Sequence, residues 1–302
     1  MNFDTNKPLD IILKALFDPY KASVKDVELI TLAMQKEGLI KDQSEIINDH
    51  IAFRTLGVSN LGIASLEKIF LSYGYVKKDT YFFEEKKLDA NWYAPPSPDY
   101  PRIFISELRV KDLSKDTQNI IHKYTSQITT DPVNQLDFKK PNMVGDFFYK
   151  PLWQAPTIEE YVQLGKESEY AAWVIYNRYY LNHYTISVHA LPSPYNRLEA
   201  FNEFLEANGI VLNTSGGKIK TSADGLLRQT SSVAKMITAT FADNTEMKIA
   251  GSYVEFAERS PLPQFAHLPI SDLKAEHLRE GFEAGNADKI FESTYTEQTN
   301  KN

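Results

Sequence analysis

Apolar and polar residues follow the same order in two distant stretches of the chain. The first stretch begins DHIAFRT at Asp49 and the second begins NHYTISVH at Asn182, and both show the alternation of a strand. Alternation places His50 and His183 on one side of their strands and leaves apolar residues for the other side. Each strand is followed by apolar residues at helical spacing, namely Ile63, Leu66, Ile69 and Phe70 in the first stretch and Leu198, Phe201, Phe204 and Leu205 in the second. The pattern predicts a strand followed by a helix, twice.

Both predicted helices end at a glycine, and strand-like sequence follows. Gly74 and Gly209 suit the left-handed conformation that ends many helices. Strand-like stretches then continue to about residue 110 in the first half and about residue 260 in the second. We therefore predict an α+β fold in which two βαβββ modules, at about 46–110 and about 181–260, pair to form a half-barrel pocket.

The rest of the chain shows mostly helical patterns. Apolar residues recur at helical spacing at about 8–40, and helical or irregular sequence fills the interval between the modules at about 111–180. The polar segment at about 261–302 is also predicted to be helical, with breaks at Gly281 and Gly285. We expect residues 1–302 to form a single domain around the paired modules.

Composition narrows the range of partners. The net charge of −7, with acidic and basic residues interspersed, leaves no basic stripe for nucleic acid. No apolar run is long enough to cross a bilayer, and the N-terminus lacks the pattern of a secretion signal, so we predict a cytoplasmic protein without membrane contact. The chain has no cysteine, which leaves His, Asp and Glu as its strong metal ligands. The sequence makes no prediction of oligomeric state.

Four side chains with metal-binding atoms are expected to meet where the modules pair. The first strands offer His50 and His183, and the last strands offer Glu107 and Glu255. Two imidazoles and one carboxylate, with open positions beside them, are typical of non-haem Fe(II) sites. Either glutamate completes such a triad, and the other would be a fourth ligand or an outer contact. For Glu107, an exposed ion pair with a neighbouring arginine is an equally good interpretation.

Arg54 is the candidate for binding a substrate. It follows His50 by four residues on the same strand face, roughly 13 Å along the backbone at about 3.3 Å per residue. A guanidinium fork binds carboxylates through two hydrogen bonds. Arg54 therefore suits the remote acid group of a dicarboxylate whose other end chelates the metal.

Five motifs together resemble one known family. They are DHIAFRT at 49–55, ISEL at 105–108, NHYT at 182–185, GSYVEFAER at 251–259 and GFEAGNADKIFEST at 281–294. They are similar to the 2-oxoadipate dioxygenase/decarboxylase family, also called hydroxyglutarate synthase, of the vicinal oxygen chelate superfamily. The resemblance spans most of the chain.

The resemblance implies a fold of paired modules and an iron-dependent reaction. His50, His183 and Glu255 would bind Fe(II), and Arg54 would contact the substrate carboxylate. The activity would convert 2-oxoadipate and O2 to 2-hydroxyglutarate and CO2 in lysine breakdown.

Two other functions are consistent with the same residues. A glyoxalase-like lyase or isomerase would use all four ligands, Glu107 included, to bind Zn or Ni and would not use O2. A binding protein would keep the pocket but show neither bound metal nor turnover. Metal identity and oxygen uptake separate the three hypotheses.

Overall fold

A curled sheet of eight strands, built from two equivalent halves, forms the centre of the structure. The computed structural model describes residues 3–269 and 272–301. The strand order is β2-β3-β4-β1-β5-β10-β7-β6. The bounds are β1 Asn48–Leu56, β2 Val76–Phe83, β3 Leu88–Ala94, β4 Arg102–Leu108, β5 His183–Ser187, β6 Lys220–Thr221, β7 Leu227–Ser231 and β10 Tyr253–Arg259.

The two halves meet at the centre of this sheet with the symmetry expected of a duplication. The first strands of the modules, β1 and β5, pair antiparallel, which is the relation produced by a twofold axis between them. Each first strand also pairs in parallel with the last strand of its own module, β1 with β4 and β5 with β10. The predicted α+β class and the pairing of two modules are confirmed.

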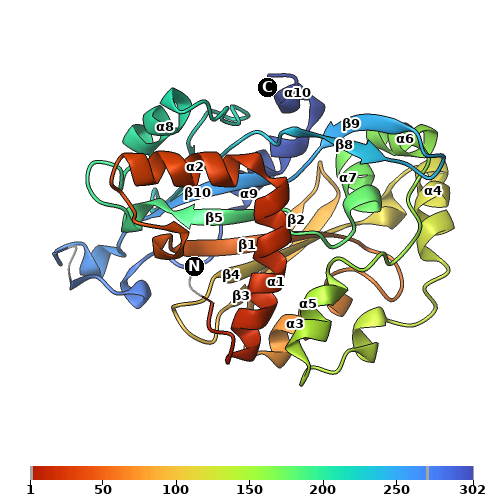
Figure 1. Cartoon of the computed structure of the whole chain (residues 1–302), viewed down its shortest axis with the longest axis horizontal. Helices are drawn as coiled ribbons and strands as arrows, with labels where there is room; N and C mark the ends of the chain where they lie inside the picture. The colour runs from red at the N-terminus through yellow and green to blue at the C-terminus, as the bar shows by residue number, and fades with distance from the viewer. Residues whose placement is uncertain (1–2, 270–271, 302) are drawn as a thin grey trace.

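Helices cover the convex face of the sheet and part of the concave face. In Figure 1, α1 and α2 cross in front of the central strands. The module helices α3 and α8 lie on the same face, where Phe70 packs on Phe53 and Phe201 packs on Phe256. The bounds are α1 Pro8–Ser23, α2 Lys25–Lys36, α3 Ile63–Ser72, α4 Lys115–Thr125, α5 Pro141–Phe147, α6 Ile158–Glu167, α7 Glu169–Asn177, α8 Leu198–Ala207, α9 Ala284–Phe291 and α10 Thr296–Thr299.

Both module helices end as their sequences predict. Gly74 has φ +87° and Gly209 has φ +80°, so each takes the left-handed conformation. The residue after each glycine donates its N–H back into the last helical turn, to the carbonyls of Phe70 and Leu205. The chain then turns away from the helix, toward the next strand in the first module.

The second module contains more strands than the βαβββ pattern predicts. The stretch from Met236 to Ala250 forms a hairpin of β8 Met236–Thr240 and β9 Glu246–Ala250, which is a separate two-stranded sheet. Figure 1 shows this hairpin next to α6 and α7, away from the central strands. Phe241 at the turn of the hairpin packs on Tyr161 of α6 and Tyr176 of α7, so the hairpin is attached to these two helices.

The segment after β10 is less helical than its polar pattern predicts. Within the described residues of 261–302, α-helix is confined to α9 and α10, with short 3-10 turns before and between them. Pro261, Pro263 and Pro269 explain this for the first part of the segment, because proline has no N–H for a helix interior. Nowhere in the described ranges is a helix both long and apolar enough to cross a membrane.

Candidate metal centre

Three side chains from the two modules converge on the concave face of the sheet. His50 lies on β1, His183 on β5 and Glu255 on β10, and one ligand atom from each lies within 4.8 Å of the other two. Glu255 Oε1 is 3.4 Å from His50 Nε2, and Oε2 is 3.0 Å from His183 Nε2. Their exposed fractions are only 1%, 6% and 1%. The cluster has the size and composition of a divalent metal site.

The strand register explains why these residues meet. His183 is paired with Ala52 of β1 and with Tyr253 of β10. Two residues further along the same face of β5 is Thr185, with His50 on one side and Glu255 on the other. Thr185 is paired with Glu255, and its hydroxyl is 3.0 Å from His50 Nε2. Three adjacent strands thus supply one ligand each from a rigid sheet, which fixes their positions before any metal binds.

The outer nitrogen of each histidine is held by the residue that precedes it. His50 Nδ1 lies 2.8 Å from Asp49 Oδ1, and His183 Nδ1 lies 3.1 Å from Asn182 Oδ1. Such contacts fix the ring so that Nε2 is the atom that faces the cluster. The Asp/Asn-His dipeptide that marks the sequence repeat therefore has a structural role at both positions.

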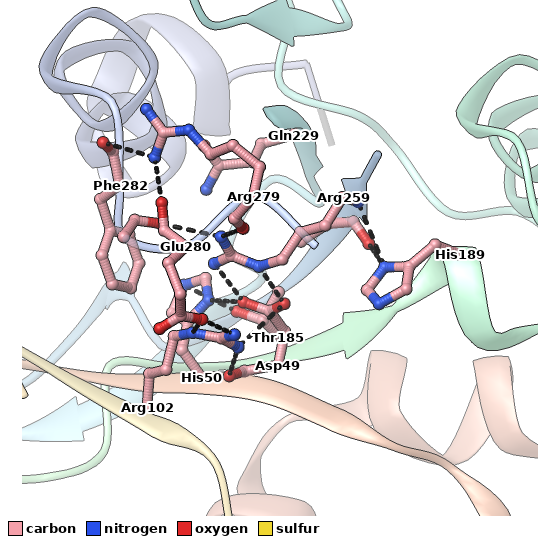
Figure 2. Close-up of polar contacts among 12 residues, drawn as sticks. Asp49, His50, Arg102, Thr185, His189, Gln229, Arg259, Arg279, Glu280 and Phe282 are labelled. Atoms are coloured by element: carbon pink, nitrogen blue, oxygen red, sulfur yellow. Dashed lines mark hydrogen bonds and ion pairs between the residues drawn. The ribbon is translucent and has the colours of Figure 1, made fainter. Parts of the chain in front are cut away.

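Asp49 is the centre of a buried ionic network (Figure 2). Its carboxylate accepts hydrogen bonds from Arg259 Nε at 2.6 Å and from Arg259 Nη2 at 2.8 Å, and it forms an ion pair with Arg102. Burial by itself raises the pKa of Asp49, but the two guanidinium groups outweigh burial and hold the pKa well below its usual range. Asp49 is therefore an anion that stabilises the ring orientation of His50.

Replacing Asp49 with asparagine is expected to weaken metal binding about 10- to 100-fold, because loss of an outer partner of a histidine ligand has effects of that size. Metal affinity measured by competition with a chelator tests this. Asp112→Asn is a matched control, since Asp112 pairs with Arg109 at the surface, away from the cluster. Equal metal affinity in wild type and Asp49→Asn would contradict the positioning role.

The charge state of the cluster suits a cation. Burial raises the pKa of Glu255, but the two imidazoles have the larger combined effect and hold the pKa well below its ordinary range. Burial lowers the pKa of His183, which favours the neutral imidazole that metals require. Burial also lowers the pKa of His50, but Glu255 and Asp49 outweigh it and raise the pKa. The cluster therefore attracts a positive charge, whether a proton or a metal.

A small cavity opens beside the three ligands. The side chains of Gln229 and Tyr253 line it together with an apolar wall made of Phe104, Phe282, Ala287, Ile290 and Phe291. Gln229 Nε2 donates to Glu255 Oε1 at 2.6 Å, and Gln229 Oε1 accepts from Asn286 of α9 at 3.0 Å. Phe282 packs against the ring of His50, as Figure 2 also shows. Helix α9 and its flanks thus roof the cluster.

Arg54 lies on the same face of β1, buried behind this roof. Its guanidinium carbon lies 5.1 Å from the ring centre of Tyr170 and 5.2 Å from that of Trp173. Nη1 donates to Thr294 Oγ1 and Nη2 donates to the carbonyl of Phe291, at 2.8 and 2.9 Å. None of the carboxylates in the described ranges forms an ion pair with it, so the buried cation lacks a counter-charge.

Tyr253 stands next to this cation. Burial raises the pKa of its hydroxyl well above the usual value, and the positive charge of Arg54 opposes that effect. The hydroxyl therefore stays protonated and available as a hydrogen-bond donor at neutral pH.

Glu107 is not brought to the cluster. Register pairs His50 with Arg102 and Thr55 with Glu107, so Glu107 points to the convex face. There its carboxylate accepts the N–H of Ile63, the first residue of α3, at 2.7 Å. His50 pairs with Arg102 of β4, and His183 pairs with Tyr253 of β10, so Arg102 and Tyr253 are equivalent. Two residues further along each strand, the equivalent of Glu255 is Phe104.

The duplicate of Glu107 in the second module is Glu258. By the same register, Glu258 occupies the equivalent place in β10 and accepts the N–H of Leu198, the first residue of α8, at 2.9 Å. A carboxylate at a helix N-terminus satisfies a free N–H group and interacts favourably with the helix dipole. Glu107 and Glu258 thus anchor the two module helices to the sheet.

Replacing Glu107 with alanine is expected to lower the free energy of unfolding by about 1–2 kcal/mol, because the first N–H of α3 loses its acceptor. The metal stoichiometry should stay unchanged. Urea denaturation and metal analysis of the purified variant measure the two quantities. Loss of metal from Glu107→Ala without loss of stability would return Glu107 to the list of ligands.

Sequence reasoning missed Gln229, Tyr253 and the roof residues Phe282 and Phe291. Tyr253 precedes Glu255 by two residues and so shares its strand face, a signal that strand alternation could have provided. Gln229 and the roof depend on contacts between segments far apart in sequence.

Three comparisons place the chain among known proteins. Residues 12–267 match the family model described as 2-oxoadipate dioxygenase/decarboxylase. The chain is 45% identical over 271 residues to the chloroplastic 2-oxoadipate dioxygenase/decarboxylase of Arabidopsis thaliana, covering 86% of this chain and 71% of the relative. It superposes with a TM-score of 0.86 and 40% identity on the crystal structure of hydroxyglutarate synthase in complex with 2-oxoadipate from Oryza sativa, covering 96% of this chain and 92% of that one.

A more distant structure shares the fold alone. A protein from Ralstonia eutropha that is assigned to the glyoxalase superfamily is 19% identical and superposes with a TM-score of 0.72, over 94% of this chain and 90% of that one. The paired-module architecture is therefore common to proteins whose sequences have diverged widely.

Proposed function

Because the chain belongs to the 2-oxoadipate dioxygenase/decarboxylase family, we propose that it converts 2-oxoadipate and O2 into 2-hydroxyglutarate and CO2. The equation balances without a further reductant, since loss of the carboxyl carbon as CO2 supplies the electrons. The observation that carries the proposal is a buried guanidinium without a counter-charge on the same pocket face as a three-ligand cluster. A buried cation of this kind favours an anionic ligand.

The donor set of the cluster fits iron. His50, His183 and Glu255 would hold Fe(II), and the cavity beside them would leave coordination positions open to small molecules. Bound iron would supply the activation of O2 and a chelation site for the 2-oxo acid end of the substrate.

The chain's own groups would orient the substrate and exclude water. Arg54 would attract the distal carboxylate, which places the 2-oxo acid end at the cluster and the methylene groups along the apolar wall. Phe104, Phe282 and Phe291 would keep bulk water away from the reacting carbon. Gln229, held by Asn286, would fix the carboxylate of Glu255 in one orientation.

The two alternatives have less support. A four-ligand glyoxalase-like site needs Glu107, whose side chain lies on the convex face of β4. A non-catalytic binding protein differs from the proposed enzyme in that it would show no turnover of 2-oxoadipate.

Oxygen uptake tests the proposal. The protein would be reconstituted with Fe(II) under anaerobic conditions, and O2 consumption would be followed with 2-oxoadipate, 2-oxoglutarate and 2-oxohexanoate. We expect one O2 consumed and one CO2 released per 2-hydroxyglutarate formed, with 2-oxoadipate as the best substrate. Product formation without O2, or no product with any of the three acids, would overturn the proposal.

A role in lysine breakdown and a cytoplasmic location stay predictions. The Arabidopsis relative carries a chloroplastic location in its name. Fractionation of the source cells would test the location.

A further inference from the structure

Among the described residues, three buried hydrogen-bond donors near the candidate metal centre have no acceptor; one is Asn182 Nδ2, on the outer side of His183, and the other two lie on the concave face. These two are the hydroxyl of Tyr253 and Nε of Arg54. The side chains are almost inaccessible, with exposed fractions of 0% and 1%. Nearly all buried polar groups in proteins are hydrogen-bonded, because an unpaired one costs free energy. Because the Tyr253 hydroxyl and the Arg54 guanidinium lie next to each other, one ligand acceptor can satisfy both donors.

The sheet register places both donors on the same side of the cluster. His50 and Glu255 form the first row across the strands, on either side of Thr185. His183 and Tyr253 form the next row, because these two residues are paired across β5 and β10. Arg54 is one step further along the same face of β1, since Ala52 is the residue paired with His183. A linear molecule that starts at the metal therefore reaches Tyr253 and then Arg54.

The contacts of Arg54 leave Nε of its guanidinium without an acceptor. Both terminal nitrogens already donate to the C-terminal segment, Nη1 to Thr294 and Nη2 to Phe291. The free nitrogen is Nε, which carries a single N–H. The two bonds use one N–H on each terminal nitrogen, whereas Nε–H has no acceptor. A carboxylate at Nε can take a second hydrogen bond to its other oxygen from a neighbouring side chain.

Tyr253 is suited to be that donor. Its ring is packed 4.7 Å from the ring of His183, which fixes the position of the hydroxyl, and its side chain lines the cavity. We propose that the distal carboxylate of the diacid substrate is bound jointly by Arg54 Nε–H and the Tyr253 hydroxyl, so that Tyr253 is a specificity-determining residue for dicarboxylates. This inference rests on the proposed function and adds the residue that recognises the second acid group.

The joint site would favour a diacid over a monoacid of equal length. A ligand without the distal carboxylate leaves both donors unpaired in the closed pocket, and that is the costly outcome. A shorter diacid would hold its distal carboxylate nearer the metal and farther from Arg54.

The test is the Tyr253→Phe variant, which keeps the ring on His183 and removes only the hydroxyl. We expect kcat/KM for 2-oxoadipate to fall about 10- to 100-fold, the range for one hydrogen bond to a charged group. For 2-oxohexanoate, which has no distal carboxylate, the change should stay below about threefold. Anaerobic calorimetry with the iron-loaded protein should show the same selective loss in 2-oxoadipate affinity, and iron content should be unchanged.

Tyr184→Phe is the matched control, because Tyr184 is a buried tyrosine on the convex face of β5, packed on Phe17 and Tyr20. Tyr184→Phe should leave kcat/KM for both substrates unchanged. Equal loss for 2-oxoadipate and 2-oxohexanoate in Tyr253→Phe, or no loss for either, would overturn the inference while leaving the proposed function in place. A wild-type protein that does not bind 2-oxoadipate would instead overturn the proposed function.

Discussion

Iron binding should be lost when Glu255 is replaced by alanine, together with all 2-oxoadipate turnover. Glu255 supplies the only anionic ligand of the cluster; its Oε1 lies 3.4 Å from His50 Nε2 and its Oε2 lies 3.0 Å from His183 Nε2. Removal of a ligand should reduce affinity by more than the roughly 10- to 100-fold that follows loss of an outer partner. Iron content per chain, measured after anaerobic reconstitution and gel filtration, should drop from one to near zero.

Glu258→Gln is the matched control for this experiment. Glu258 is a buried glutamate three residues further along β10, but it points to the convex face and anchors α8. The control should lose some stability and keep its iron. Full iron retention in Glu255→Ala would show that the cluster is not the metal site.

Replacing Arg54 with alanine should have the second largest effect, which we expect in kcat/KM for 2-oxoadipate and not in iron binding. Iron binding should be retained, because Arg54 makes no contact with the three ligands among its hydrogen bonds. We expect kcat/KM for 2-oxoadipate to fall about a hundred-fold or more, the range seen when one partner of a buried charged contact is truncated. Steady-state oxygen uptake with iron content measured in parallel tests this.

Arg54→Lys separates the charge from the geometry. Lysine keeps the positive charge but has no planar fork, so it should restore only part of the lost affinity. Because Arg54 also ties Phe291 and Thr294 to β1, melting temperatures of both variants are needed to exclude unfolding. An unchanged KM for 2-oxoadipate in Arg54→Ala would contradict a role in substrate binding.

The duplicated scaffold could be predicted from the sequence because its signals are local. A strand with alternating residues, an apolar helical stripe and a terminal glycine occur within about 30 residues of each other in each module. These features also place His50 and His183 on the concave face without knowledge of the sheet.

The face of the sheet on which Glu107 lies could not be predicted in this way, because it depends on pairing between strands. A shift of one residue in register exchanges the two faces of a strand. The sequence did contain one hint of the correct register. A small residue precedes both Glu107 and Glu258, which favours aligning Glu107 with Glu258 and not with Glu255. A C-terminal lid was an open possibility from the sequence, but the residues that form the roof could not be predicted, since α9 meets the pocket only through tertiary packing.

The exchange of a carboxylate for a ring between the equivalent positions 255 and 104 has a consequence for how such a centre can arise. A homodimer of identical single modules has two-fold symmetry, so whatever residue stands at this position must appear twice. Such a dimer would surround its cation with two glutamates or with none. Once the copies are joined in one chain they are free to diverge, so that one side carries Glu255 and the other Phe104, and the side without the carboxylate supplies no protein ligand to the cation.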